Sequence, residues 1–268
     1  MLEKPTDVAS PLLSVVDLSA GYNGSAVVRE ISITVAAGEI VALLGANGAG
    51  KTTTLGAIAG LVKPLGGHVL LDGVATTGKP AHKLAREGVA LVPEDRALFH
   101  ELTTRENLRV AGVRGRGRES EEQILELLPE LKKCLTRKAG LLSGGEQQML
   151  AVGRALVGSP KLLIVDEMSL GLAPVVVERL LPVLQDVARE LGTAVLVVEQ
   201  HVALAMDVAS RAYVLAHGRL TLEGNTADLR SNHDLIAASY FGDLDAEAEL
   251  SASAASPTFD GSAPSPAE

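Results

Sequence analysis

One stretch decides the fold of this chain: Gly45-Ala46-Asn47-Gly48-Ala49-Gly50-Lys51-Thr52-Thr53. The apolar run over 39–44 predicts a buried strand before it, and the pattern over 51–59 predicts a helix after it. The spacing is that of G-x-x-x-x-G-K-[ST], in which glycines let the backbone surround a phosphate without Cβ clashes. Open amides at a helix N-terminus favour an anion, Lys51 can reach β- and γ-phosphates, and Thr52 can hold Mg²⁺. The alternative is a simple glycine-rich turn, and the flanking strand and helix argue against it.

A second signal lies further along, where the apolar run over 161–165 ends in Asp166 and Glu167. A strand that ends in two carboxylates suits the acidic partner of a phosphate loop. Asp166 would reach Mg²⁺ directly or through water, and Glu167 would polarise an attacking water. Phosphoryl transfer depends on this positioning and charge neutralisation more than on covalent chemistry. Two solvated acids at a strand end are the alternative, which the phosphate loop makes less favoured.

The third signal is Leu142-Ser143-Gly144-Gly145-Glu146-Gln147-Gln148, at the start of a predicted helix. Ser143 is a natural N-cap, and the two glycines leave backbone amides open to an anion. Two phosphate-binding elements far apart in one chain suggest two half-sites. If two chains pair head to tail, the loop of one and the serine-glycine turn of the other would close each nucleotide.

Composition narrows the class of protein. The chain has 268 residues, a net charge of −9 and only 2% aromatic residues. A negative chain lacks the basic face that nucleic-acid binding requires, so we expect no nucleic-acid partner. Cys134 is the single cysteine, which excludes an internal disulfide. No apolar run approaches the ~20 residues needed to cross a bilayer, and residues 1–11 do not resemble a signal peptide. The expectation is a soluble protein or one held at a membrane by a partner.

Strand and helix patterns alternate along the chain and predict an α/β fold with a mostly parallel sheet. Strands over 12–18 and 26–35 flank a turn at 21–24 and predict an antiparallel β subdomain. Residues 95–142 predict an inserted α-helical subdomain. Thr103 starts a helix there with a capping box, and Pro129 should kink or divide a helix over 119–135.

Further patterns set the remaining expectations. A helix over 176–191 should turn its apolar face inward, with Val177, Leu180, Leu184, Val187 and Leu191 buried. The predicted organisation is a flexible leader over 1–11, one domain over 12–242 and a disordered tail over 243–268. The tail is rich in Ala, Ser, Pro and Glu and cannot bury enough apolar surface to order itself.

Taken together, the three signals resemble those of ABC-type ATPases, and the resemblance covers residues 12–242. Within that superfamily the chain is similar to the ATP-binding subunits of branched-chain amino acid importers. The residues that carry this similarity are Gly45-Ala46-Asn47-Gly48-Ala49-Gly50-Lys51, Val92-Pro93-Glu94-Asp95-Arg96, Ser169-Leu170-Gly171-Leu172-Ala173-Pro174 and Val198-Glu199-Gln200-His201.

The resemblance implies a P-loop NTPase core that binds ATP and Mg²⁺, dimerises as ATP binds and separates after hydrolysis. This motion drives a membrane permease that receives its solute from an extracellular or periplasmic binding protein. The second ATPase subunit can be a copy of this chain or a sister chain. The subunit would lie in the cytoplasm, on the inner face of the membrane.

Residue roles follow from the resemblance. Tyr22 would stack on adenine, although a purely structural tyrosine is an alternative. Glu94 stands where most relatives have a glutamine that contacts Mg²⁺ and senses the permease, so Asp95 to Leu108 should face the membrane partner. The metal ligands would be Thr52, Glu94 and Asp166. The nucleotide contacts would come from Tyr22, Gly45, Asn47, Gly48, Ala49, Gly50, Lys51, Thr52, Thr53, Ser143, Gly144, Gly145 and Glu146.

Glu167 would be catalytic, and the sensor of the γ-phosphate is open between two residues. Counting back from Ser210-Arg211 places Gln200 where relatives have a histidine, with His201 one residue beyond. Gln200 is favoured, unless the loop shifts and His201 takes the role. Ala173 also departs from the pattern, because many relatives have an aspartate there that acts across the dimer.

Other functions are compatible with parts of the sequence. The ATPase could serve a urea or amide importer, because the substrate meets the permease and not this subunit. A soluble ABC protein acting on ribosomes or DNA is a second alternative, disfavoured by the single set of motifs and the absence of a long heptad insertion. A kinase-like NTPase is a third, and the Ser143 turn argues against it.

Overall fold

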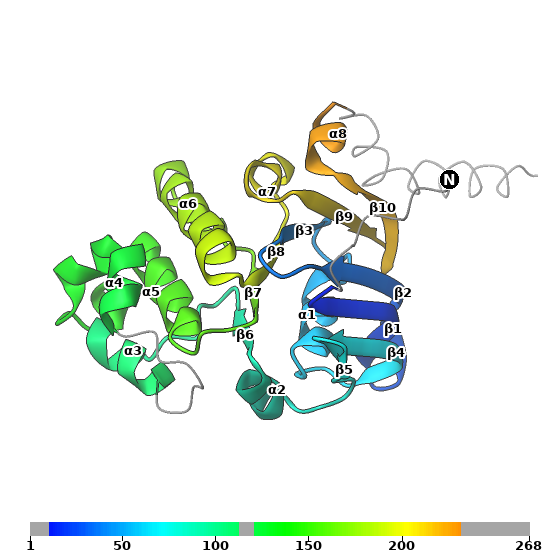
Figure 1. The fold of residues 1–268 in the computed structure, drawn as a ribbon, viewed down its shortest axis with the longest axis horizontal. Helices are drawn as coiled ribbons and strands as arrows, with labels where there is room; N and C mark the ends of the chain where they lie inside the picture. Colours follow the sequence, from blue (N-terminus) through cyan, green and yellow to red (C-terminus); the bar gives the residue numbers. More distant parts are fainter. Residues whose placement is uncertain (1–10, 113–120, 232–268) are drawn as a thin grey trace, which may run out of the picture.

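The computed structural model describes residues 11–112 and 121–231, which form two sheets (Figure 1). The larger sheet has the strand order β10-β9-β3-β8-β7-β6, and all its pairs are parallel except the antiparallel edge strand β10. Its strands are β3 (Ile40–Leu44), β6 (Val89–Val92), β7 (Leu162–Asp166), β8 (Ala194–Glu199), β9 (Arg211–Ala216) and β10 (Arg219–Asn225). The second sheet is antiparallel, with the order β2-β1-β4-β5. Its strands are β1 (Leu13–Tyr22), β2 (Ser25–Val35), β4 (Pro64–Leu71) and β5 (Val74–Ala75).

The central strands of the larger sheet are buried on both faces, which explains why they are apolar except for the terminal Asp166 of β7 and Glu199 of β8. Their side chains still alternate between two cores, because successive Cβ atoms in a strand point to opposite faces. On β3, Ala42 and Leu44 join the core beneath the helical side, whereas Val41 and Leu43 join the core shared with the antiparallel sheet. The predicted mostly parallel α/β fold is confirmed.

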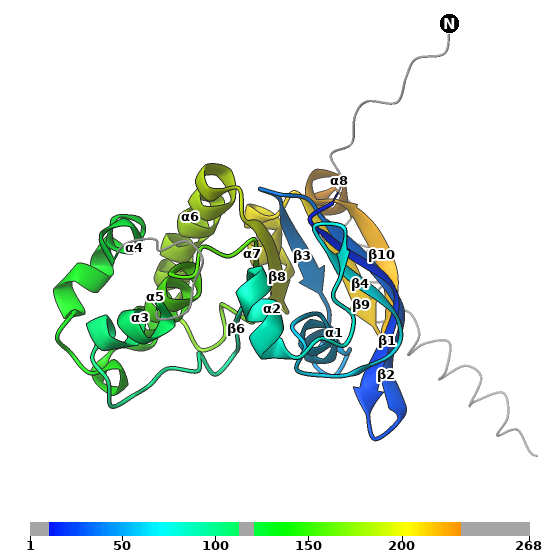
Figure 2. The same cartoon turned by 60° about the horizontal axis from the view of Figure 1, so that its bottom comes forward.

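Helices cover both faces of the larger sheet. The α-helices are α1 (Lys51–Ile58), α2 (Ala81–Glu87), α3 (Thr104–Gly112), α4 (Glu121–Leu127), α5 (Gly144–Leu156), α6 (Pro174–Leu191), α7 (Val202–Val208) and α8 (Thr226–Arg230). Helix α1 lies between the two sheets, and α5 and α6 lie on the opposite side of the larger sheet (Figure 1). Figure 2 shows α2 beside the edge strand β6, which it precedes in the chain.

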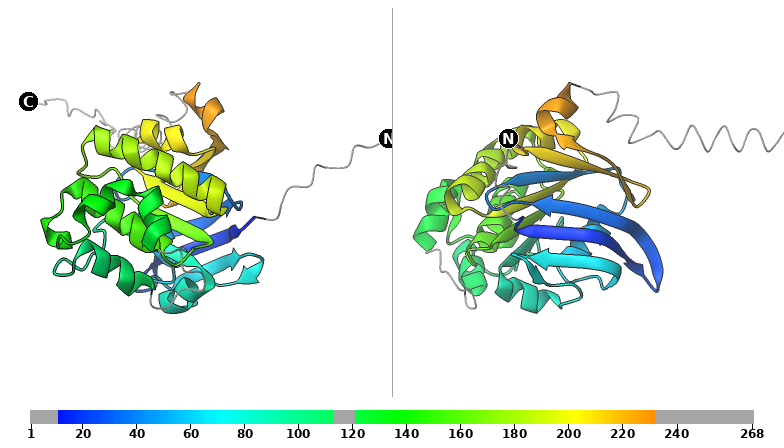
Figure 3. Two further views of the ribbon diagram at one scale, coloured as in Figure 1. Left: turned by 60° about the vertical axis from the view of Figure 1, so that its left-hand side comes forward. Right: turned by 45° about the vertical axis from the view of Figure 1, so that its right-hand side comes forward.

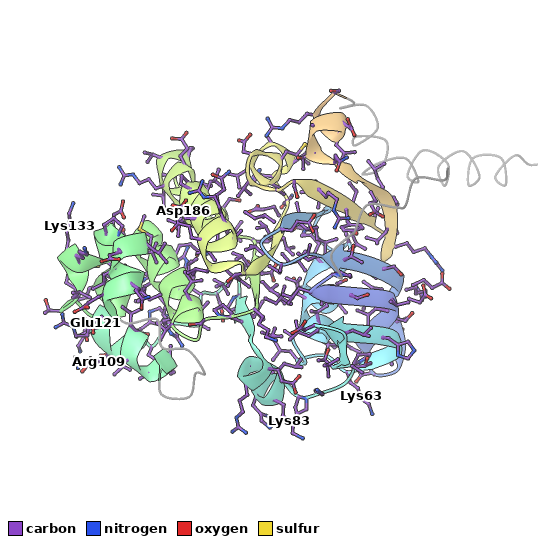
Figure 4. The ribbon with its side chains drawn as sticks, in the orientation of Figure 1. Lys63, Lys83, Arg109, Glu121, Lys133 and Asp186 are labelled. Carbon is purple, nitrogen blue, oxygen red and sulfur yellow. The ribbon has the colours of Figure 1, made fainter. Side chains whose placement is uncertain are left out.

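The helical subdomain forms the left-hand part of Figure 1 and contains α3, α4 and α5. Thr103 accepts a bond from the Glu106 amide, and Glu106 accepts one from the Thr103 amide, so the predicted capping box is present. Pro129 divides the expected helix: α4 ends at Leu127, and a 3₁₀ segment follows over Pro129–Cys134. A second 3₁₀ turn covers Ala139–Leu141. Arg109 and Glu121, labelled side by side in Figure 4, form an ion pair that joins α3 to α4.

Two local predictions were wrong. Gly21 and Tyr22 belong to β1, and the turn consists of Asn23 and Gly24 alone. Asn23 and Gly24 adopt the positive φ angles of a tight hairpin. Leu191 is 39% exposed at the end of α6, where the helix has passed beyond the core.

The curved antiparallel sheet stands at one side of the molecule (Figure 3). Among the residues that the structure describes, no helix is long and apolar enough to cross a membrane. The predicted tail over 243–268 and all but the last residue of the leader over 1–11 fall outside those residues, and the domain boundaries stay predictions.

Candidate active site

The site lies where parallel strands of the larger sheet end. Leu44 of β3 pairs with Glu199 of β8, and Asp166 of β7 pairs with Val198 of β8. Because the carboxyl ends of parallel strands meet at one edge of a sheet, the three segments that follow these strands emerge together. The phosphate loop, Glu167 and the Gln200-His201 pair are therefore brought to the same edge.

The backbone of the phosphate loop needs its glycines. Gly48 and Gly50 have φ angles of 82° and 108°, which disfavour residues with a Cβ. A Cβ on Gly45 would lie 2.5 Å from the Leu215 carbonyl oxygen. The loop is therefore packed against β9, and Gly50 serves as the N-cap of α1. The Ala49 carbonyl accepts a bond from the Gly218 amide at 3.0 Å, which ties the loop to the β9–β10 turn.

Lys51 is the buried cation of the site, with 4% of its side chain exposed. Its Nζ donates to the Gly45 carbonyl at 2.8 Å and to the Ala46 carbonyl at 3.1 Å. The same nitrogen lies 3.2 Å from Glu167 Oε1. The loop therefore presents a fixed positive charge directly beside the carboxylate that the sequence analysis placed in the catalytic role.

Asp166 is the second buried acid. Thr52 Oγ1 donates to Asp166 Oδ2 at 3.4 Å, while the buried Oδ1 has no hydrogen-bond partner among the described residues. Burial raises the pKa of Asp166 to about 6, with the Glu167 and Glu94 carboxylates adding to the rise and Thr52 and Lys51 opposing it. The site thus collects three carboxylates around one lysine.

This donor set could hold a hard divalent cation. Carboxylate and hydroxyl oxygens are the ligands that Mg²⁺ prefers, and the unpaired Asp166 Oδ1 is an oxygen available to it. Within the two described ranges, no group of three His, Cys, Asp or Glu side chains forms a complete metal site. Mg²⁺ usually takes one or two carboxylates together with substrate phosphates, which is what this arrangement offers.

Tyr22 lies at the end of β1 and is 54% exposed. The hairpin that carries it adjoins the phosphate loop, because a Cβ on Gly50 would lie 2.4 Å from Val28 of β2. Gln200 and His201 are both exposed in the loop between β8 and α7, and His201 occupies the N-cap position of that helix. Both keep their candidacy as the sensor of the γ-phosphate.

The Ser143 turn lies in the helical part of the molecule, at the N-terminus of α5. The Ser143 hydroxyl accepts from the Glu146 amide, and the Glu146 carboxylate accepts from the Ser143 amide at 2.8 Å and pairs with Arg137. A Cβ on Gly145 would lie 2.6 Å from Val176 of α6, so that glycine allows two helices to approach closely. Ser143 and Glu146 thus form a preorganised, capped helix N-terminus.

Sequence reasoning missed two polar contacts near the site. The buried Glu199 accepts two bonds from Ser169. The Arg96 guanidinium donates to the side-chain oxygens of Gln147 and Gln148, which joins the segment after β6 to the start of α5. A carboxylate at the end of an otherwise apolar strand was the available signal for Glu199. Arg96 belongs to the motif over 92–96, but nothing in the sequence pattern indicated its bonds to the two glutamines.

The family model described as ABC transporter matches residues 28–169. The branched-chain amino acid transport ATP-binding protein BraG of Pseudomonas aeruginosa is 40% identical over 224 residues, which are 82% of this chain and 96% of the relative. The chain belongs to the ABC transporter family. This ABC ATPase is also 33% identical to the lipopolysaccharide export ATP-binding protein LptB of Acidithiobacillus ferridurans, over 87% of this chain and 98% of the relative.

Solved structures agree with this assignment. An ATP-binding subunit of an ABC transporter superposes with a TM-score of 0.72 at 32% identity, covering 88% of this chain and 98% of that chain. The ADP conformation of another ABC transporter cassette gives a TM-score of 0.74 at 25% identity, covering 84% and 94%. The protein is therefore an ATP-binding, ATP-hydrolysing subunit, and ATPases of this family dimerise and act with membrane permease subunits.

Proposed function

We propose that this ABC ATPase drives an importer of branched-chain or other hydrophobic amino acids. The support is its similarity to two ATP-binding proteins of branched-chain amino acid transport: BraG at 40% identity and a probable LivF of Archaeoglobus fulgidus at 35%. The chain would work in the cytoplasm, held on the inner face of the membrane by its permease. A periplasmic or extracellular binding protein would deliver the solute to the permease.

The observation that carries the enzymatic part is the contact between Lys51 and Glu167 at the phosphate loop. Lys51 binds the β- and γ-phosphates, and Glu167 accepts a hydrogen bond from the attacking water and polarises it. Gln200 or His201 contacts the γ-phosphate from the neighbouring loop. Tyr22 stacks on the adenine from the hairpin beside Gly50. The phosphates are further held by the open amides of Gly45 to Thr53 and the N-terminus of α1.

Mg²⁺ would be held by Thr52 and Asp166, with Glu94 close by. The unpaired Asp166 Oδ1 and the crowding of three carboxylates support this assignment, because a cation would relieve their repulsion. When bound, Mg²⁺ supplies charge neutralisation for the phosphate oxygens.

The second half of each nucleotide site would come from another ATPase subunit. Ser143 is exposed at the N-terminus of α5, Gly144 and Glu146 are partly exposed, and Gly145 is buried; the neighbouring Leu141 is 72% exposed. A capped helix N-terminus attracts an anion. In the dimer this turn would contact the γ-phosphate bound to the partner chain.

The permease would contact the segment 95–108 and the adjacent groove. This groove has a volume of about 990 Å³ and is lined by α2, β6 and α5. Its wall includes Arg154, whose Nε is buried without a hydrogen-bond partner, and Arg96, which reaches Gln147 and Gln148 of α5. A permease segment in the groove would therefore bear on the same helix that carries the Ser143 turn.

Membrane sedimentation tests the transport assignment. The full chain is mixed with membranes that contain or lack the predicted permease partner. Sedimentation only with the permease is expected, and a protein that stays in the supernatant in both would overturn it.

The similarity to LptB keeps lipopolysaccharide export as a second candidate. Import is favoured if an amino-acid-loaded binding protein stimulates ATP hydrolysis in the reconstituted complex. Export is favoured if the binding protein has no effect and lipopolysaccharide stimulates hydrolysis.

A further inference from the structure

Glu199 is a buried carboxylate at the edge of the site that the reaction described above does not use. It is the last residue of β8 and is 1% exposed. Its Oε1 accepts a bond from the Ser169 amide at 3.0 Å, and its Oε2 accepts one from the Ser169 hydroxyl at 2.8 Å. The proximity of the His201 backbone also lowers the pKa of this carboxyl group. One side chain therefore joins the segment after β7 to the segment after β8.

The segment after β7 needs such an anchor. Glu167 has a φ of 44°, a left-handed conformation that is unfavourable for a non-glycine residue and persists only where its surroundings hold it. On one side its amide donates to the Val198 carbonyl at 2.9 Å. On the other side, two residues further, Ser169 is held by Glu199. Both anchors lie at the end of β8.

A carboxylate is a costly choice at this position. Every other residue of β8 is apolar and buried, and burial raises the pKa of Glu199, although the bonds from Ser169 oppose the rise. A buried ionisable group is retained when its hydrogen bonds compensate for desolvation. Both hydrogen bonds of Glu199 come from Ser169, in the segment that carries Glu167, and Glu199 itself leads directly into the Gln200-His201 pair.

We propose that Glu199 is a positioning residue for hydrolysis: acting through Ser169, it holds Glu167 in a fixed arrangement with the candidate γ-phosphate sensor, which follows Glu199 directly in the chain. The proposal rests on the proposed role of Glu167. It assigns Glu199 no contact with ATP or water. Loss of Glu199 would loosen the geometry of the reacting groups and leave Lys51 and the phosphate loop in place.

The test measures steady-state ATP hydrolysis and ATP binding in the full chain. Glu199→Ala is expected to lower kcat about 10- to 100-fold, the cost of a small misplacement of catalytic groups. The KM and the affinity for a fluorescent ATP analogue should stay within about twofold, because the phosphate loop does not depend on this bond. Ser169→Ala, which removes only the hydroxyl bond, should lower kcat less. The double variant Ser169→Ala/Glu199→Ala should have the same kcat as Glu199→Ala, since both changes break the same link.

Glu39→Ala is the matched control. Glu39 is a half-buried carboxylate that also accepts bonds from a backbone amide, a serine and an arginine, but it precedes β3, at the opposite end of that strand from the phosphate loop. Glu39→Ala should lower the melting temperature of the protein and leave kcat unchanged. If Glu199→Ala does not fold, Glu199→Gln replaces it. Its kcat should be lower than that of the wild type.

The outcomes separate two failures. The inference is tested only if Glu167→Gln is inactive. In that case a wild-type kcat in Glu199→Ala, or in both Glu199→Gln and Ser169→Ala, overturns it. An equal fall of kcat in Glu39→Ala also overturns it, because the effect would then be general destabilisation. Full turnover in Glu167→Gln instead overturns the proposed catalytic role on which the inference rests.

Discussion

The phosphate loop and the Ser143 turn are both helix N-termini suited to phosphate, yet they differ in how complete they are. The loop is closed by its own chain: Lys51 is buried, touches two loop carbonyls and lies beside Glu167. The Ser143 turn bonds to itself and to Arg137, at an exposed end of α5. One element is a prebuilt site within the chain. In the proposed dimer, the other would gain a ligand only when a second chain brings one.

Changing Glu167, the carboxylate beside the phosphate loop, should have the largest effect. Glu167→Gln removes the charge that polarises water and keeps the shape of the side chain. Hydrolysis should slow by about 10²-fold or more, as expected when a general base is lost. ATP binding should be retained. Phosphate release measures the first quantity and titration with a fluorescent ATP analogue the second. Unchanged turnover would show that another residue serves the water.

Changing the binding side of the loop tests whether that half-site works alone. Lys51→Ala removes the buried cation and leaves Glu167, Asp166 and Glu94 without it. The affinity of the isolated chain for ATP should fall about 10- to 100-fold, the scale for losing a buried charged contact. The same fluorescent titration measures it. An affinity equal to that of the wild type would mean that the loop is not the primary nucleotide site.

The Ser143 turn should show the opposite pattern. In the Glu167→Gln background, Ser143→Arg should abolish ATP-dependent dimerisation in size-exclusion chromatography and leave ATP binding by the single chain unchanged. Thr103→Ala is the matched control, because Thr103 caps α3 by the same kind of capping box. Its loss should cost about 1 kcal/mol of stability and leave dimerisation intact. Weakened ATP binding in Ser143→Arg would contradict the division into two half-sites.

The base contact should matter less than the phosphate contacts. Tyr22→Ala should weaken ATP binding about threefold to tenfold, since one aromatic stacking contact contributes about 1 kcal/mol. Tyr22→Phe should bind ATP like the wild type, because it keeps the ring. If both variants bind ATP equally well, Tyr22 is a structural residue of the hairpin and not a contact of the nucleotide.

The last test concerns the stability of the fold, at a residue that lies away from both elements. Burial would raise the pKa of Glu39, but bonds from Arg211, from the Ala36 amide and from Ser210 outweigh it and hold the pKa below 4.5. A lowered folded-state pKa stabilises the protein above pH 4.5, and this stabilisation is lost as the pH falls through the folded value. Glu39→Gln should therefore cost about 1 to 3 kcal/mol near neutral pH and less in acid. Urea unfolding at several pH values measures this, and an equal cost at every pH would refute it.

Much of the site was predictable because its parts are local. The spacing of Gly45 to Thr53 defines a loop whose glycine φ angles and lysine contacts lie within a few residues. The Ser143–Glu146 capping box is also a local pattern. Glu199 and Arg96 were missed because their partners, Ser169 and the two glutamines, lie far away in the sequence. The end of β1 was misplaced because only the paired geometry shows that the turn has two residues.

The sequence by itself determined the class of chemistry: a phosphate loop, an acidic strand end and a capped glycine turn, each defined by short-range sterics and hydrogen bonding. It also determined the mostly parallel sheet, because strands buried on both faces must be apolar throughout. Only the tertiary structure decided which side chains meet. Strand register placed Leu44 opposite Glu199 and Asp166 opposite Val198, and so brought Lys51, Glu167 and Ser169 to one edge. The reason is that strand pairing and packing are long-range choices that a linear pattern does not contain.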